Sequence, residues 1–287
     1  MKRDERKLAL IFLFLASSYI IIFIFKPLAE TIYKVFYQVD SLGHPLKFVS
    51  WNNFQVILSD SNFLKSIGNS WVYTLLTVPI SKVTGLCLAI LARKKTATSF
   101  IYEAMFALPI AVAIPAICMI FSLMYSPNIG LINQVLDSKI QWLKDPNLSM
   151  LSLSVIGIWI STGYAFIYLL PAIRNIPSSI LDAAKIDSVG FFGRIRYIYL
   201  PYLSPTFFYL LLMDIPNGLM IMSIPNILTR GGPNDSTLTI MLYIYKQISA
   251  IGNQSLANAA TLLTIFMMAI TILVMFKLEK RVVFYDD

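Results

Sequence analysis

Two long apolar runs of the sequence each carry a set of residues, several of them polar or aromatic, whose spacing matches one turn of a helix. The first set is Asp214, Asn217, Gly218 and Ile221, and the second is Ser161, Tyr164 and Tyr168, with Trp159 nearby. Such intervals place each set on one face of a helix. Hydrogen-bonding groups beside aromatic faces suit the non-covalent binding of a hydroxyl-rich solute such as a sugar. The alternative is that these small and polar residues only join helices to one another inside a membrane.

Lys82 also stands inside an apolar run, where a charged side chain is costly and is a candidate for function by default. Three placements are open for it. It could line the same cavity as the polar residues, pair with Asp214, or extend its ammonium group to the membrane surface.

Sequence signatures of covalent or metal chemistry are absent. The chain has no glycine-rich phosphate loop, no His-Glu-x-x-His motif and no nucleophile elbow. The presence of a single histidine, His44, and of only two cysteines argues against a zinc cluster. Cys87 and Cys118 lie inside apolar runs and are interpreted as small apolar residues. We therefore expect no enzyme activity and no cofactor in this chain.

Composition places the chain in a membrane. Of its 287 residues 57% are hydrophobic and 13% are charged, which is about half the charged fraction of a soluble domain. The formal net charge is +8, but the charges lie in short clusters between apolar runs, which argues against nucleic acid. Six segments have the length to cross a bilayer: Leu8–Phe25, Ser70–Ala92, Phe100–Tyr125, Met150–Leu170, Leu200–Ser223 and Ala257–Phe276. The first follows a basic stretch like a signal peptide, but it lacks a clear cleavage site and is interpreted as a retained span.

The basic residues predict the orientation of these spans. If the spans alternate, four clusters of Lys and Arg fall on one side: at the N-terminus, at 93–95, at 174–196 and at 277–281. That side is the cytoplasm by the positive-inside rule. Both termini are then predicted to be cytoplasmic.

The loop between the fourth and fifth spans, at about 176–200, predicts a pair of short helices. Pro177 ends the preceding helix, and Ser179 with Asp182 three residues on could form a capping box. Ala183 and Ala184 are small enough for another chain to approach closely. Gly190 offers a turn. On spacing alone, a loop that merely joins two spans is an equal alternative.

This loop resembles the coupling loop of permeases in binding-protein-dependent ABC importers. The residues that carry the resemblance are Asp182, Ala183, Ala184 and Asp187, followed by Ile198, Leu200 and Pro201. Asp182 stands where that family has Glu, and Ser188 stands where it has Gly, a loss for which Gly190 could compensate. A second segment, Leu228 to Pro233 followed by Thr237, resembles the Thr-x-Gly-Gly-Pro outer loop of maltose-type and glycerol-phosphate-type sugar permeases. This resemblance points to the first of the two permease subunits in such systems. With Phe48–Gly85, the resemblance spans about residues 45–280.

The resemblance implies an all-α fold of the six-span type I importer permease. It implies an N-terminal span and extracytoplasmic lead-in at 1–65 and a permease core at 66–287. The implied partners are a second permease, two ATPase subunits that carry ATP and Mg, an extracytoplasmic solute-binding protein and a sugar. The implied ATPase-coupling residues are Asp182, Ala183, Ala184, Asp187, Gly190, Leu200 and Pro201. Those lining the sugar site are Ser161, Tyr164, Gly218 and Ile221, with Asp214 and Asn217 beside them.

The sequence leaves several alternatives open. An ion-coupled secondary transporter would need ionisable groups within the spans, for which Asp214 and Lys82 qualify. A membrane scaffold would leave the Ala-Ala loop unexplained. A permease for glycerol phosphate would need a cation in the cavity, which only Lys82 could supply. Among sugars, the resemblance favours oligosaccharides.

Overall fold

The computed structural model describes residues 3–284, and within them helices dominate. The chain divides into two compact units. The first combines Met1–Phe63 with Ile244–Phe266, and the second combines Leu64–Tyr243 with Met267–Asp287. Five helical segments are long and apolar enough to cross a membrane, and a bent pair of helices brings the number to six.

The first unit begins with a long helical segment. Helix α1 (Arg3–Ile20) continues through a π-helical turn (Ile21–Phe25) into α2 (Lys26–Lys34), so the predicted first span extends nine residues further than expected. The π turn ends two residues before Pro27, which has no N–H to donate to the turn before it.

A small hairpin follows in the first unit, formed by β1 (Tyr37–Val39) and β2 (Pro45–Phe48), and leads into α3 (Asn52–Ser59). At the hairpin turn the Asp40 carboxylate accepts hydrogen bonds from the backbone N–H groups of His44 and Leu42, which lowers the pKa of Asp40. The Val39 N–H donates to the Ser255 hydroxyl over 2.8 Å, so the hairpin is tied to the beginning of α14 (Gln254–Val282).

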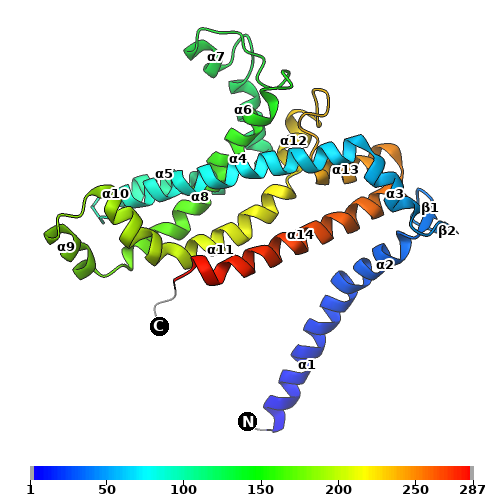
Figure 1. Ribbon diagram of the computed structural model, residues 1–287, viewed down its shortest axis with the longest axis horizontal. Coiled ribbons are helices and arrows are strands. Elements are labelled where there is room, and N and C mark those ends of the chain that lie inside the picture. The colour runs from blue at the N-terminus through cyan, green and yellow to red at the C-terminus, as the bar shows by residue number, and fades with distance from the viewer. Residues whose placement is uncertain (1–2, 285–287) are drawn as a thin grey trace. The chain divides into compact units, whose positions relative to one another are not determined.

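Three long helices run side by side in the second unit: α4 (Ser61–Leu91), α8 (Ser149–Arg174) and α11 (Leu200–Leu219) (Figure 1). Helix α8 packs against α11 on one side and α5 (Ser99–Ala111) on another. Their core includes Phe166, Leu169, Ile173, Leu203 and Leu210. An ideal Cβ on Gly85 would lie 2.5 Å from the Cβ of Ala165, so α4 and α8 meet almost backbone to backbone at this point.

The predicted third span is two helices rather than one. Helix α5 ends at Ala111, and α6 (Ile114–Met124) leaves at an angle of 99° (Figure 1). The cause is local, because Pro115 cannot donate to the carbonyl of Ala111 and its ring disfavours helix before it. Val112 and Ala113 accordingly take extended backbone angles.

Short helices complete the second unit. Helix α7 (Leu131–Val135) follows α6, and α9 (Ser178–Ile186) and α10 (Phe191–Arg194) lie between α8 and α11. A π-helical turn (Ile195–Tyr199) joins α10 to α11. Helix α12 (Ser223–Leu228) follows α11, and the chain reaches α14 through α13 (Ile240–Lys246) and a third π-helical turn (Gln247–Ile251).

Candidate functional site

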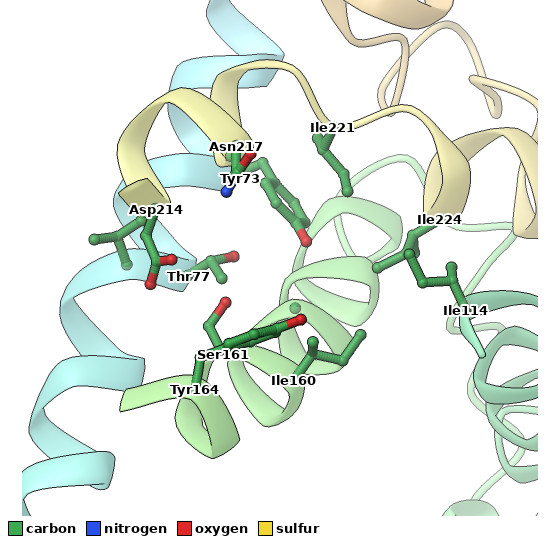
Figure 2. Close-up of a pocket in the computed structure, with 13 residues that line it drawn as sticks. Tyr73, Thr77, Ile114, Ile160, Ser161, Tyr164, Asp214, Asn217, Ile221 and Ile224 are labelled. Atoms are coloured by element: carbon green, nitrogen blue, oxygen red, sulfur yellow. The ribbon is translucent and has the colours of Figure 1, made fainter. Parts of the chain in front are cut away.

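A cavity of about 150 Å³ lies among the helices of the second unit (Figure 2). Helix α4 contributes Tyr73, Thr77 and Val78, and Ile114 lies at the start of α6. All six predicted solute-binding residues line the cavity: Ser161 and Tyr164 from α8, Asp214, Asn217 and Gly218 from α11, and Ile221 just after it. Residues about 50 positions apart in the sequence therefore meet in one place, as predicted, and their role in binding stays a prediction.

A second cavity of about 270 Å³ shares three lining residues with the first: Tyr164, Asp214 and Asn217. It adds the rings of Tyr168 and Tyr209, whose centroids are 5.3 Å apart. The two cavities together present carboxylate, amide and phenol groups beside aromatic faces. This arrangement can hydrogen-bond and stack on a hydroxyl-rich solute.

Lys82 and Asp214 form an ion pair between α4 and α11. Their side chains are only 6% and 14% exposed. Lys82 does not line either cavity, whereas Asp214 lines both. Of the three placements of Lys82 that the sequence left open, the structure therefore shows the ion pair with Asp214.

Glycines set the width of the first cavity. A Cβ on Gly157 would lie 2.2 Å from the hydroxyl oxygen of Tyr73, and one on Gly218 would lie 2.8 Å from the hydroxyl of Thr74. Gly218 therefore lines the cavity with its backbone, and its missing side chain makes room for α4.

The sequence did not single out Tyr73 and Thr77, which face the cavity from α4 (Figure 2). A signal existed, because the buried hydroxyl residues Ser70, Thr74, Thr77 and Ser81 recur at intervals of three or four along this helix. Trp159, by contrast, lies outside the lining of both cavities, and its ring centroid is 5.9 Å from that of Phe121.

The predicted coupling loop forms the expected pair of helices, α9 and α10. Leu181 and Ala184 are buried in the core of the second unit. Asp182, Ala183 and Asp187 are exposed on the opposite side. The two alanines therefore differ: one packs inward, and the other faces outward.

Two details of the loop correct the prediction. Helix α9 begins at Ser178 after Pro177 with no side-chain cap, so Ser179 is already inside the first turn. The Asp182 carboxylate does not complete a capping box but accepts a hydrogen bond from the Lys185 ammonium over 2.6 Å. Gly190 does not take the place of the missing glycine, because its φ is −64°, whereas Ser188 itself adopts a φ of +54°. The left-handed residue thus stands where the resembling family has Gly.

Apolar side chains are exposed around this loop. Ile186 at the end of α9 is 84% exposed, and Phe192 in α10 is 82% exposed. Phe191, Tyr197 and Leu200 are also exposed, whereas Pro201 is half-buried. An apolar surface of this kind marks a place of contact with another protein or with the membrane, and Phe191–Leu228 is itself apolar enough to span one.

The Gly-Gly-Pro segment forms a tight loop after α12. The Thr237 hydroxyl donates to the Gly232 carbonyl over 2.7 Å and lies 2.7 Å from the Thr229 hydroxyl. Together with Tyr125 and Trp142, the loop lines a separate cavity of about 490 Å³. Within residues 3–284, no group of three His, Cys, Asp or Glu side chains could hold a metal ion.

Residues 77–283 match the family described as binding-protein-dependent transport system inner membrane component. The match covers more than half of the 287 residues. The chain belongs to this family. The permease is thus a multi-pass membrane protein.

Curated relatives span nearly the whole permease. The sn-glycerol-3-phosphate transport system permease protein UgpA of Agrobacterium fabrum is 30% identical over 269 residues, which cover 91% of each chain. The sulfoquinovosyl glycerol transport system permease protein SmoG of the same organism is 28% identical over 247 residues, 84% of this chain and 80% of the relative.

A solved structure supports the fold of the permease. It is that of a bacterial ABC transporter involved in the import of the acidic polysaccharide alginate, with a TM-score of 0.84 and 19% identity. The superposition covers 97% of both chains. The prediction of a type I importer permease fold is confirmed.

Proposed function

We propose that this permease moves a sugar across the cell membrane by alternating access, through the cavities lined by Tyr164, Asp214 and Asn217. The observation that carries the proposal is the meeting of polar and aromatic side chains from α4, α8 and α11 in cavities within the spans. Polar groups at such depth mark substrate pathways in membrane proteins. The relatives named for glycerol phosphate and sulfoquinovosyl glycerol transport also handle hydroxyl-rich solutes.

The proposed complex contains other chains. A second permease completes the pathway, two ATPase subunits carry ATP and Mg, and an extracytoplasmic binding protein delivers the sugar. A solved relative of this fold is described in complex with an alginate pentasaccharide-bound periplasmic protein, which supports such a partner. Both termini of the permease are then cytoplasmic, in line with the basic clusters that flank the spans. The proposed functional division has the N-terminal span and lead-in at 1–65 and the permease core at 66–287, and it differs from the compact units in that Ile244–Phe266 is counted with the core.

The exposed side of the α9–α10 loop is proposed to bind the ATPase subunit. Asp182, Ala183 and Asp187 would face this partner, and Gly190, Leu200 and Pro201 lie where the chain returns to α11. Ala184 would not contact the partner but would hold α9 in position, because it packs in the core of the second unit. Closure of the ATPase pair on ATP would move the loop and open the cavity outward, and hydrolysis would reset it.

Reconstitution tests the proposal. The complete complex in proteoliposomes should take up sugar with ATP and magnesium, and the permease alone should not hydrolyse ATP. Uptake that persists without ATP and collapses with the proton gradient would instead indicate an ion-coupled carrier.

The two alanines of α9 offer a matched pair of variants for coupling. Ala183→Arg changes only the exposed side, so the permease should fold while sugar-stimulated ATP hydrolysis and uptake are lost. Ala184→Arg places a charge in the core and should prevent folding itself. If the complex with Ala183→Arg transports normally, this surface does not couple to the ATPase.

Glycerol phosphate is a second candidate solute, since UgpA is 30% identical to this chain. A phosphate group is usually held by Arg or Lys. Among the described residues that line the two cavities there is neither. A neutral sugar is therefore the better candidate solute. If glycerol phosphate competes with the sugar for uptake, glycerol phosphate becomes the better candidate.

A further inference from the structure

The carboxylate of Asp214 is the one charged group that faces both cavities in the described part of the chain. One of its oxygens accepts from the Lys82 ammonium. The other oxygen receives no hydrogen bond from residues 3–284, and Asp214 lies beside Thr77 and Asn217 at the cavity (Figure 2). A carboxylate with free lone pairs in this position can accept hydrogen bonds from a solute.

Lys82 lies behind this carboxylate. It is 5% exposed and lines neither cavity, and besides Asp214 its ammonium group contacts only the hydroxyl of Ser81, over 3.4 Å, among the described residues. Burying a charged carboxylate within a membrane span costs much free energy when no partner offsets the charge. Lys82 offsets this cost by a direct ion pair with Asp214 and does not itself meet the solute.

We propose that the Lys82–Asp214 pair is a charge filter, which makes the cavities accept neutral, hydroxyl-rich solutes and refuse anionic ones. The inference rests on the proposed function and adds to it the residue pair that selects neutral sugars. An ionised carboxylate only accepts hydrogen bonds, so it favours solutes that offer hydroxyl donors. It repels a phosphate, sulfonate or carboxylate group, and the ammonium that could attract these groups is already paired. Lys82 is in this account a positioning residue, and Asp214 is the residue that touches the solute.

The test uses the complete complex of permeases and ATPases in nanodiscs, without the binding protein, so that only the cavity selects. Saturation-transfer NMR suits weak binding. The two probes are methyl β-glucoside and methyl β-glucuronide, which differ only in the charged group at the sugar's C6. The wild-type complex should bind the glucoside and show little binding of the glucuronide.

Asp214→Asn should invert this preference. The glucoside should lose about tenfold in affinity, which corresponds to one hydrogen bond to a charged group. The glucuronide should gain affinity, because Lys82 is left without its counter-charge. The control is Lys65→Met, which removes another lysine of α4 that lines neither cavity, and it should leave both affinities unchanged.

The double variant Lys82→Met with Asp214→Asn separates a filter from a structural link. Replacing both partners of a buried pair is often tolerated, so this complex should assemble even if the single variants do not. If the pair is a filter, the double variant should bind the glucoside weakly and should not distinguish it from the glucuronide. Recovery of wild-type binding in the double variant would overturn the proposal, as would a wild-type complex that binds the two probes equally. Absence of ATP-driven uptake of any sugar by the wild-type complex would instead refute the proposed function itself.

Discussion

Gly85→Ala tests the close approach of α4 and α8, on which the cavity depends. The added Cβ would lie 2.5 Å from the Cβ of Ala165 and 3.3 Å from two backbone atoms of α8. Ordinary contacts between such carbons begin at about 3.5 Å. Both methyl groups are fixed to backbone and cannot rotate away, so the helices must separate.

The expected magnitude is the balance of two terms. Overpacking of a tight contact costs about 1–3 kcal/mol. Alanine in place of glycine within a helix stabilises it by about 0.5–1 kcal/mol. The net effect is a destabilisation of up to about 2.5 kcal/mol, together with a wider cavity.

The measurement is the apparent melting temperature of the assembled complex, with sugar uptake as a second readout. Each kcal/mol corresponds to roughly 2–4 °C in domains of this size. The matched control is Gly68→Ala in the same helix, where an added Cβ meets nothing within 4 Å, and it should raise stability slightly. If Gly85→Ala proves as stable as Gly68→Ala, the backbone-to-backbone packing of α4 and α8 is wrong.

Three further predictions concern the side of the molecule with the α9–α10 loop. Ser188→Gly should stabilise the loop by up to about 1 kcal/mol, because the φ angle of Ser188 is positive. Gly190→Ala should leave the stability unchanged, because an added Cβ there meets nothing within 4 Å. The check is hydrogen exchange, which should slow in the loop of the Ser188→Gly variant alone. Arg174→Lys should destabilise the fold by about 1–3 kcal/mol. The guanidinium donates to the backbone carbonyls of Ala92 and Arg93, which follow α4, and to the Glu103 carboxylate of α5, and a single ammonium cannot make all of these bonds. An unchanged melting temperature would contradict this prediction. The hydrogen bond from the Lys185 ammonium lowers the pKa of Asp182 from its ordinary 3.8. The stabilising contact is therefore complete above about pH 4 and is lost as the pH falls through the lowered pKa. A carboxyl titration of Asp182 by NMR with a midpoint above 4 would refute this.

Much of the cavity could be predicted because helical periodicity is a property of the sequence itself. The spacing of Asp214, Asn217 and Gly218 fixes one face of a helix, and costly polar groups in a span indicate which face is turned inward. The partner face on α4, with Tyr73 and Thr77, was missed, because threonines are common in membrane helices and Thr77 looks like an ordinary packing residue.

Other features depend on tertiary structure and could not be predicted with the same certainty. The bend between α5 and α6 required Pro115 to outweigh a continuous apolar run, which length and hydropathy alone do not reveal. The pairing of Lys82 required a partner 132 positions away. The positive φ of Ser188 was missed because the glycine two residues later was the more obvious place for a turn.

The central claim is that solute passes through the cavity among α4, α8 and α11. Its most direct test is ATP-driven sugar uptake into proteoliposomes by a complex with Ser161→Trp, which fills the cavity from α8. The control is Ile167→Trp, at an exposed position of the same helix. We predict that the Ser161→Trp complex assembles and hydrolyses ATP but takes up no sugar, while the control transports. Uptake at the wild-type rate by assembled Ser161→Trp complex would contradict the claim.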